Sequence, residues 1–347
     1  MPTAQRTISH IKIKADDNYE FGFKLGKALG AQIKDRIEKN KAVYHALGRR
    51  HMPGLIKDAQ GFLPKIKRKF PELIEEIKGM SQGAGVAFEE LLVLNCEEEL
   101  LDFFIPRCTS VAVHIGNGEI LLGHNEDWLS TYRQQGMILV DGQIKQLKFL
   151  ALSFMGQLVG TSCALNSYGL TYTVNSLCNE RFRYGIPRNF LLRNILEKRY
   201  LKDAEHVLLS PSRTIAANTL CVWRAMAMDD IEAFWGHHQL FHGKKWLVHT
   251  NHPLLGKDQN QKNTDVESIR RYQRVCEILT ATQPNIEEST LKRVLKDHRA
   301  GICGHPKSAH SYWGSTVASA IVNPSERWIE VCYSNPCRHK YFRYYLK

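Results

Sequence analysis

The pattern of apolar and polar positions changes character near residue 107. Before that point, apolar side chains recur at helical spacing among lysines and acids. A proline at position 71 favours a helix first turn, and Gly83-Ala84-Gly85 breaks the helical pattern. The predicted helices cover residues 19–41, 71–78 and 88–101. We therefore predict that residues 1–107 form a helical N-terminal segment.

After residue 107, short runs rich in β-branched residues are separated by Gly and Asn turns, which predicts strands. The first two strands form a hairpin across Gly116-Asn117-Gly118. The predicted strands cover residues 109–115, 119–123, 137–140, 143–154, 158–165, 170–174, 219–225, 231–235, 315–322 and 328–333. Helical spacing returns over residues 187–200, 203–209, 265–279 and 286–295. Residues 108–347 are thus predicted to form one α+β domain, with strands buried between helices.

Composition adds a basic charge to this picture. The 347 residues carry a net charge of +12, which suits nucleic acid, an anionic membrane or acidic small molecules as partners. The densest basic cluster, at residues 65–69, is interrupted by Ile66 at helical spacing and is interpreted as the solvent-exposed face of a helix. We expect no nucleic-acid partner, because charge alone is weak support for one. With no apolar membrane span and no secretory leader, a cytoplasmic location is expected.

Metal and nucleotide chemistry have little support in the sequence. The nine cysteines are scattered and form no C-x-x-C pair, so no zinc ribbon is expected. His237, His238 and His242 are interpreted as a wet turn, and Cys303-Gly304-His305 as a loop rather than a Cys–His pair. No P-loop or G-x-G-x-x-G is present. We therefore expect neither a metal nor a cofactor, although acyl-coenzyme A remains a candidate co-substrate.

Cys108 is the strongest catalytic candidate. It begins the first predicted hairpin, whose second strand leads to Asp127 and returns that carboxylate to the beginning of the first strand. A nucleophilic thiol needs a base, and an N-terminal α-amine, with a pKa of about 7.7–8.0, can serve. Only cleavage of the bond between Arg107 and Cys108 would supply that amine. The alternative is a buried structural cysteine.

Several motifs, taken in order, carry a family resemblance. They are Gly22 and Gly26, residues 72–94, Cys108-Thr109-Ser110, Gly123-x-Asn125-x-Asp127-Trp128, residues 166–170 with Asn175, Thr250-Asn251-His252, residues 316–324 and Asn335-Pro336-Cys337. In these motifs the chain resembles the acyl-coenzyme A:6-aminopenicillanic acid acyltransferase family, or C45 peptidases, within the N-terminal-nucleophile (Ntn) hydrolases.

The resemblance implies a four-layer αββα sandwich and a precursor that cuts itself before Cys108. Residues 1–107 would remain bound as a helical subunit, and residues 108–347 would form the catalytic subunit. In the mature protein the sulfur of Cys108 would be the nucleophile and its own α-amine the general base. The acyl group of a small amide or thioester would pass to the sulfur, and water or an amine would then take it.

Roles for other matched residues follow from the chemistry. Asn251 and Asn175 are oxyanion-hole candidates, because a side-chain amide is a neutral donor; the alternative for both is a turn or cap. Asp127 would orient the amine of Cys108. His124 stands where several cysteine relatives have arginine, and is either a donor or a structural histidine.

Two further residues and one helix face are candidates whose roles the sequence does not assign. Ser110 is a supporting candidate next to the nucleophile. Ser315 lies where the penicillin acyltransferase pattern has an arginine, so the resemblance does not extend penicillin acylation to this chain. Arg270, Arg271 and Arg274 share one helix face, interpreted as solvated, with an anionic-substrate role as the alternative.

The sequence therefore predicts a cysteine amidohydrolase acting on a small N-acylated amine, amino acid or peptide. An N-acyltransferase that uses acyl-coenzyme A through the same acyl-enzyme is the first alternative. A non-catalytic basic binding protein on the same fold is the second.

Overall fold

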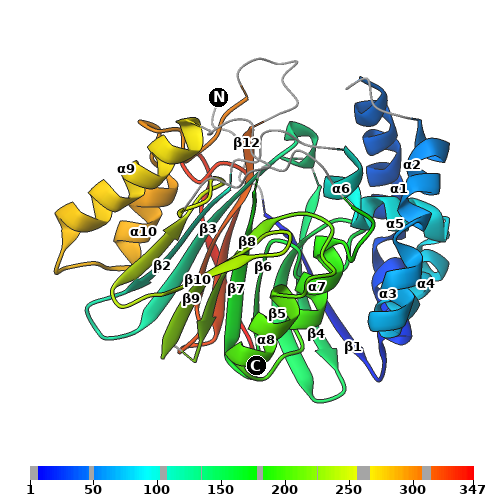
Figure 1. Cartoon of the computed structure of the whole chain (residues 1–347), viewed down its shortest axis with the longest axis horizontal. Helices are drawn as coiled ribbons and strands as arrows, with labels where there is room; N and C mark the ends of the chain where they lie inside the picture. Colours follow the sequence, from blue (N-terminus) through cyan, green and yellow to red (C-terminus); the bar gives the residue numbers. More distant parts are fainter. Residues whose placement is uncertain are drawn as a thin grey trace.

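Two β-sheets lie face to face between two layers of helices (Figure 1). The computed structural model describes residues 7–46, 51–101, 108–133, 135–177, 183–224, 226–255, 266–306 and 314–347. No helix in these ranges is both long and apolar enough to cross a membrane. The α+β class and the four-layer αββα arrangement predicted from the sequence are confirmed.

The larger sheet has eight strands in the order β1-β4-β5-β6-β7-β8-β9-β10. Their bounds are β1 Ser9–Ala15, β4 Met137–Ile144, β5 Leu147–Phe154, β6 Cys163–Asn166, β7 Leu170–Ser176, β8 Ala217–Trp223, β9 Ala227–Ala233 and β10 His238–His242. All neighbours are antiparallel except β1, which runs parallel to β4.

The smaller sheet has six strands in the order β11-β2-β3-β12-β13-β14. Their bounds are β2 Thr109–His114, β3 Ile120–Trp128, β11 Trp246–His249, β12 Ser315–Asn323, β13 Trp328–Tyr333 and β14 Phe342–Tyr345. The β2–β3 hairpin predicted from its Gly-Asn-Gly turn is confirmed, and Gly118 has the positive φ of 84° that this turn requires.

Helices cover the outer face of each sheet (Figure 1). Helices α9 (Val266–Thr282) and α10 (Glu288–Leu295) pack on the smaller sheet. The others pack on the larger sheet or on one another. They are α1 Asn18–Ala46, α2 Met52–Gln60, α3 Leu63–Lys69, α4 Pro71–Ala84, α5 Phe88–Asn95, α6 Glu97–Leu101, α7 Arg188–Ile195 and α8 Leu201–Leu208.

Three apolar layers hold the stack together. One lies between the sheets, one between the larger sheet and its helices, and one between the smaller sheet and α9 and α10. Strands with helices or a second sheet on both faces bury nearly every side chain, as in β3, where all nine residues are buried. Apolar burial on this scale is the main favourable contribution to folding.

The backbones of α1 and α4 lie in direct contact. Gly22 and Gly26 of α1 face α4, and a Cβ built on Gly26 would lie 2.2 Å from the carbonyl oxygen of Met80. On α4, Gly79 and Gly83 face α1 in the same way, since a Cβ on Gly83 would lie 2.2 Å from the carbonyl oxygen of Phe23. This spacing of glycines on both helices allows an approach that any larger residue would block.

Several element predictions need correction, including the second hairpin, which turns at residues 145–146 rather than at 141–142, and the strand predicted over residues 158–165, which is β6. The segment 1–107 is not wholly helical, because β1 forms the edge of the larger sheet; only two of its seven residues are buried, so its polar–apolar alternation is weak. The predicted helix over residues 88–101 is two helices that meet at Cys96. The region predicted as a wet turn contains β10, whose partly exposed position at the sheet edge explains its polar sequence. The domain boundary at residue 107 itself stays a prediction.

Candidate active site

Cys108 lies directly before β2, buried between the two sheets with 2% of its surface exposed. In the β2–β3 hairpin, Thr109 pairs with Asn125 and Ser110 with His124. Continuing that register places Cys108 opposite Glu126, on the same face of the sheet as Ser110 and His124. The expected return of a carboxylate to the start of the strand is therefore found, but it belongs to Glu126.

Glu126 is the carboxylate that contacts the thiol. Its Oε1 lies 3.2 Å from Cys108 Sγ, while the nearest contact from Asp127 is its backbone oxygen at 3.9 Å. Burial, then the charges of Glu126 and Asp127, raise the pKa of the Cys108 thiol well above its ordinary value. Burial alone would raise the pKa of Glu126 too, but hydrogen bonds and the charge of His124 outweigh burial and hold it below its usual range. The thiol is therefore protonated and donates to an ionised carboxylate.

A chain of buried hydrogen bonds continues from Glu126. Its Oε2 lies 3.2 Å from His124 Nε2, and His124 Nδ1 lies 3.0 Å from Ser110 Oγ. Ser110 donates its one hydroxyl hydrogen to Asn175 Oδ1 at 2.5 Å and accepts from Thr173. The two ring nitrogens of His124 therefore connect Ser110 to Glu126 within this chain of contacts.

The same atoms qualify as a metal-binding set, because ligand atoms of Cys108, His124 and Glu126 lie within 4.8 Å of one another. In this structure each of the three is engaged in the hydrogen-bond chain. We therefore interpret the group as a proton relay rather than a metal centre.

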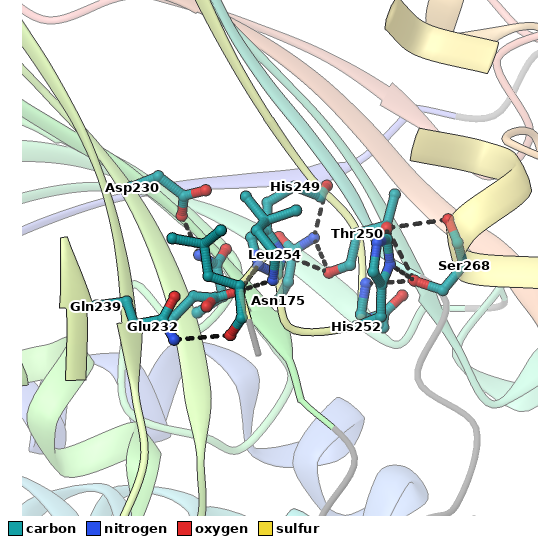
Figure 2. A network of polar contacts seen from close by, with 12 residues as sticks. Asn175, Asp230, Glu232, Gln239, His249, Thr250, His252, Leu254 and Ser268 are labelled. Carbon is teal, nitrogen blue, oxygen red and sulfur yellow. Dashed lines mark hydrogen bonds and ion pairs between the residues drawn. The ribbon is translucent and has the colours of Figure 1, made fainter. Parts of the chain in front are cut away.

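Asn175 and Asn251 both lie near the site, but they differ in how many of their amide hydrogens are already hydrogen-bonded. Both hydrogens of the Asn175 amide are engaged, by the carbonyl oxygens of His249 at 3.1 Å and Thr250 at 2.7 Å, part of the network drawn in Figure 2. The amide of Asn251 donates to the Ser176 carbonyl at 2.9 Å. Asn251 therefore keeps one amide hydrogen outside the hydrogen bonds of the described residues, so it suits an oxyanion-hole role better than Asn175. Both roles stay predictions.

A second buried ionic network supports the segment that carries Asn251 (Figure 2). The ring of His249 contacts Glu232 at 2.8 Å, and the backbone nitrogen of Leu254 donates to the same Glu232 oxygen at 2.7 Å. Burial alone would lower the pKa of His249, but Asp230 and Glu232 raise it above its ordinary value. The contact of the ring with Glu232 therefore links the end of β11 to β9 of the other sheet.

Arg271 of α9 is a site residue that the sequence interpretation missed. It is buried, unlike the exposed Arg270, and its Nη1 donates to the Cys108 carbonyl oxygen at 2.6 Å and to Thr109 Oγ1 at 3.0 Å. Its Nη2 donates to Asn251 Oδ1 at 2.8 Å. The solvated-face interpretation is therefore wrong for Arg271. The signal was present in the helical spacing, which places it on the buried stripe of Ser268, Val275, Ile278 and Leu279.

Asp127 lies on the opposite face of β3 from Glu126. Its Oδ1 accepts from Thr316 Oγ1 at 2.5 Å, next to a bulge where β12 loses register with β3. Ser315, the residue before Thr316, is buried and pairs with Trp128 of β3. The structure thus joins the carboxylate of Asp127 to Thr316 rather than to the thiol, and the proposed contact of Asp127 with a new α-amine stays a prediction.

Helices α6 and α7 add charges that the sequence interpretation did not include. Arg188 pairs with Glu98 at 2.5 Å, its backbone nitrogen donates to Glu99 at 2.7 Å, and its Nη1 donates to Ser176 Oγ at 2.8 Å. Burial alone would lower the pKa of Arg188, but the charges of Glu98, Glu99 and Glu126 raise it. Helix α6 of the N-terminal segment therefore adds charged groups to the surroundings of Glu126. Arg107, the predicted cleavage position, lies outside the described residues.

Comparison with known proteins gives a family and two informative relatives. The profile of the family described as acyl-coenzyme A:6-aminopenicillanic acid acyl-transferase matches residues 113–338. β-Alanyl-dopamine/carcinine hydrolase of Drosophila melanogaster is 30% identical over 217 residues, 55% of this chain and 54% of that protein. The chain therefore spans about half the length of that relative. The 40 kDa form of an acyltransferase of the same description from Emericella nidulans is 24% identical over 271 residues, 75% of this chain and 74% of that protein.

Solved structures give weaker likenesses. A variant of conjugated bile acid hydrolase from Clostridium perfringens has a TM-score of 0.49 and 12% identity, covering 69% of this chain and 97% of that chain. Penicillin V acylase from Agrobacterium tumefaciens has a TM-score of 0.38 and 12% identity, covering 65% and 82%.

Proposed function

Because the chain belongs to the acyl-coenzyme A:6-aminopenicillanic acid acyl-transferase family, we propose that it is a self-processing cysteine amidohydrolase of small N-acylated amines. The observation that carries this proposal is the buried thiol of Cys108, which lies 3.2 Å from an ionised carboxylate at the start of a strand. A thiol kept only for packing has no need of an ionised carboxylate beside it, since that charge is costly to bury.

Self-cleavage begins before any α-amine exists, so it needs another base. Glu126 would take the thiol proton as Cys108 Sγ attacks the carbonyl carbon of residue 107. The carbon–nitrogen bond then breaks, the nitrogen of Cys108 gains a proton, and a thioester to the sulfur remains. Water hydrolyses the thioester, which restores the thiol and leaves a carboxylate at residue 107 and a free amine on Cys108.

In turnover, the new amine would take over as general base. Sγ attacks the substrate carbonyl, the substrate amine leaves with a proton, and the acyl group stays on sulfur until water removes it. Negative charge on the carbonyl oxygen would be met by the free hydrogen of the Asn251 amide. Arg271 fixes both that asparagine and the Cys108 carbonyl oxygen, so it acts as a positioning residue.

The substrate we propose is an amide with a small acyl part. The relative that is 30% identical is named for hydrolysis of β-alanyl-dopamine and carcinine.

An acyltransferase is the second candidate, supported by a relative of that name that aligns over 75% of this chain. The two activities share the acyl-enzyme and differ in whether water or an amine removes the acyl group. Incubation with a thioester donor, with and without acceptor amines, separates them. Formation of an acceptor amide would identify a transferase, and release of free acid unaffected by acceptor would identify a hydrolase.

Intact mass spectrometry tests the proposal directly. We expect two fragments, the second beginning at Cys108, and hydrolysis of N-acyl amines by the processed protein. Cys108→Ala should stay whole and inactive, while Cys276→Ser, which changes a cysteine on α9, should behave like the wild type. A wild-type chain that stays whole and turns over no amide would overturn the proposal and favour a non-catalytic binding protein.

A further inference from the structure

A second group of nucleophilic side chains lies outside the hydrogen-bond chain of the thiol. It combines two histidines and two cysteines from the loop between α10 and β12 and from the turn after β13. One ligand atom from each lies within 4.8 Å of all the others. We call this the Cys–His cluster; its members are His298, Cys303, His305 and Cys337.

The distances in the Cys–His cluster are those of a tetrahedron around a metal. With Zn–S near 2.3 Å and Zn–N near 2.05 Å, tetrahedral edges are about 3.8 Å for S···S, about 3.6 Å for S···N and about 3.3 Å for N···N. The two sulfurs lie 3.6 Å apart, and His305 Nε2 lies 3.7 Å from Cys303 Sγ and 3.3 Å from Cys337 Sγ. The two histidine Nε2 atoms lie 3.1 Å apart.

Hydrogen bonding among the four groups does not account for this geometry. His305 Nε2 is approached by three atoms at once, the Nε2 of His298 and the two sulfurs. A single ring nitrogen has either one hydrogen or one lone pair, so it can satisfy one of them. A disulfide does not account for the geometry either. An S–S bond is about 2.05 Å long, and its formation would leave both histidines without a thiol partner in the cluster.

We propose that the Cys–His cluster binds one Zn²⁺ ion as a structural site. Two thiolates and two neutral imidazoles form a common zinc ligand set, and their two negative charges neutralise the ion. Four protein ligands leave no position open for water or substrate, which separates this site from a catalytic one. The Asn335 amide donates to Cys303 Sγ at 3.5 Å, the kind of supporting hydrogen bond that ligating sulfurs receive.

The zinc would fix a loop that supports the candidate active site. Gly304 lies between two of the ligands, and its backbone nitrogen donates to Thr316 Oγ1 at 2.8 Å. Thr316 in turn donates to Asp127 Oδ1 at 2.5 Å. On the same side, Asn125 donates to the carbonyl oxygen of Ile302 at 2.9 Å. Loss of the ion would therefore loosen the end of β3 without removing a group that touches substrate.

Metal content and cobalt spectroscopy test this proposal on the full chain. We expect protein purified under reducing conditions from zinc-supplemented medium to retain about one zinc per chain after desalting. Replacement by Co²⁺ should give the visible absorption of tetrahedral cobalt together with a sulfur-to-cobalt charge-transfer band. Removal of the ion by a strong chelator should lower Tm by several degrees and should be reversed by added zinc.

Variants assign the site. Cys303→Ser combined with Cys337→Ser should bring zinc content close to zero and abolish the charge-transfer band, while Cys276→Ser on α9 should keep both. If the double variant does not fold, the cobalt spectrum of the wild type decides. A wild-type chain with no retained zinc and no tetrahedral cobalt spectrum would overturn the proposal, as would a Cys303–Cys337 disulfide in freshly purified protein. None of these readouts depends on amide hydrolysis, so the zinc site and the proposed function fail separately.

Discussion

At the scale of single residues, the chemistry of Cys108 depends on one neighbouring charge. Glu126 is ionised and accepts the thiol hydrogen, while the amine that would later serve as base does not exist before cleavage. Glu126→Gln keeps the size and polarity of the side chain but removes its ability to take a proton. Since general-base catalysis contributes roughly 10²–10⁴-fold, we expect self-cleavage to slow by about that factor.

The rate of this cleavage can be followed by intact mass after cell-free synthesis. Glu75→Gln, which changes an exposed carboxylate on α4, is the matched control and should cleave at the wild-type rate. Because the pKa of Glu126 lies below its ordinary value, wild-type cleavage should persist as the pH falls toward about 4.3. A Glu126→Gln chain that cleaves as fast as wild type would assign the base to another group.

A residue on α6 gives a stability prediction with a definite sign. Burial, followed by the charge of Glu98, raises the pKa of Glu99 to about 7. An acid with a raised folded-state pKa binds more protons in the folded protein than in the unfolded chain. Its contribution to stability is therefore fully present below the unfolded pKa, about 4.3, and is lost as the pH rises through about 7. The full size of the effect is about 4 kcal/mol, since each pKa unit corresponds to about 1.4 kcal/mol.

Urea unfolding at pH 5 and pH 8 measures this effect, in a Cys108→Ala background that keeps the chain whole. Glu99→Gln removes the titration, so the stability of the parent relative to the variant should be about 2.5 kcal/mol greater at pH 5 than at pH 8, since part of the effect already lies below pH 5. Other titrating groups are common to both proteins and cancel. A difference that is the same at both pH values would show that Glu99 titrates normally.

At the scale of elements, the crossing of α1 and α4 is set by glycine. A methyl group on Gly26 would meet the Met80 carbonyl oxygen of the facing helix backbone, which cannot rotate out of the way. Gly26→Ala should therefore force the two helices apart and cost roughly 1–3 kcal/mol, as overpacking does in other cores. Thermal unfolding measures the loss, and Gly116→Ala is the control, since nothing lies within 4 Å of its added Cβ. Equal stability of the two variants would contradict the close crossing.

The same scale shows what the sequence reveals and what it does not. The β2–β3 hairpin follows from β-branched runs and a Gly-Asn-Gly turn, and it correctly returns a carboxylate to Cys108. Whether that carboxylate is Asp127 or Glu126 depends on the pairing register, because a shift of one residue exchanges the two faces of a strand. Turn signals locate a hairpin more precisely than they fix its register, so the sequence points to Asp127 whereas the structure places Glu126 beside the thiol.

Long-range contacts are the part that local patterns do not encode. Arg271 reaches Cys108 across 163 residues of sequence, and Cys303 meets Cys337 across 34, with spacings that match no compact motif. Edge strands such as β1 are also hard to predict, since one partly exposed strand has too few buried positions to produce a strong alternation. The fold class survives these errors because it depends on many segments, whereas a site depends on a few individual side chains.

At the scale of the whole molecule, the N-terminal segment is part of the larger sheet and of its helical layer. Strand β1 pairs with β4 along its whole length, from Ser9↔Ile138 to Ala15↔Ile144. Helices α1 to α6 belong to the same apolar layer as β4, β5 and β7. Cleavage of the bond before Cys108 would remove one covalent link and none of these contacts. The two fragments should therefore stay together as one particle.

Size-exclusion chromatography of the processed protein measures this association. We expect both fragments to elute together at the mass of the uncut chain at low micromolar concentration, and to separate only in denaturant. High salt should not release residues 1–107, because the shared layer is apolar and salt screens only charges. Cys108→Ala, which stays whole, marks the elution position of the intact chain. Fragments that separate under native conditions would show that the pairing of β1 with β4 and the shared apolar layer do not hold the two fragments together. Residue 107 would then be the boundary between two independent domains.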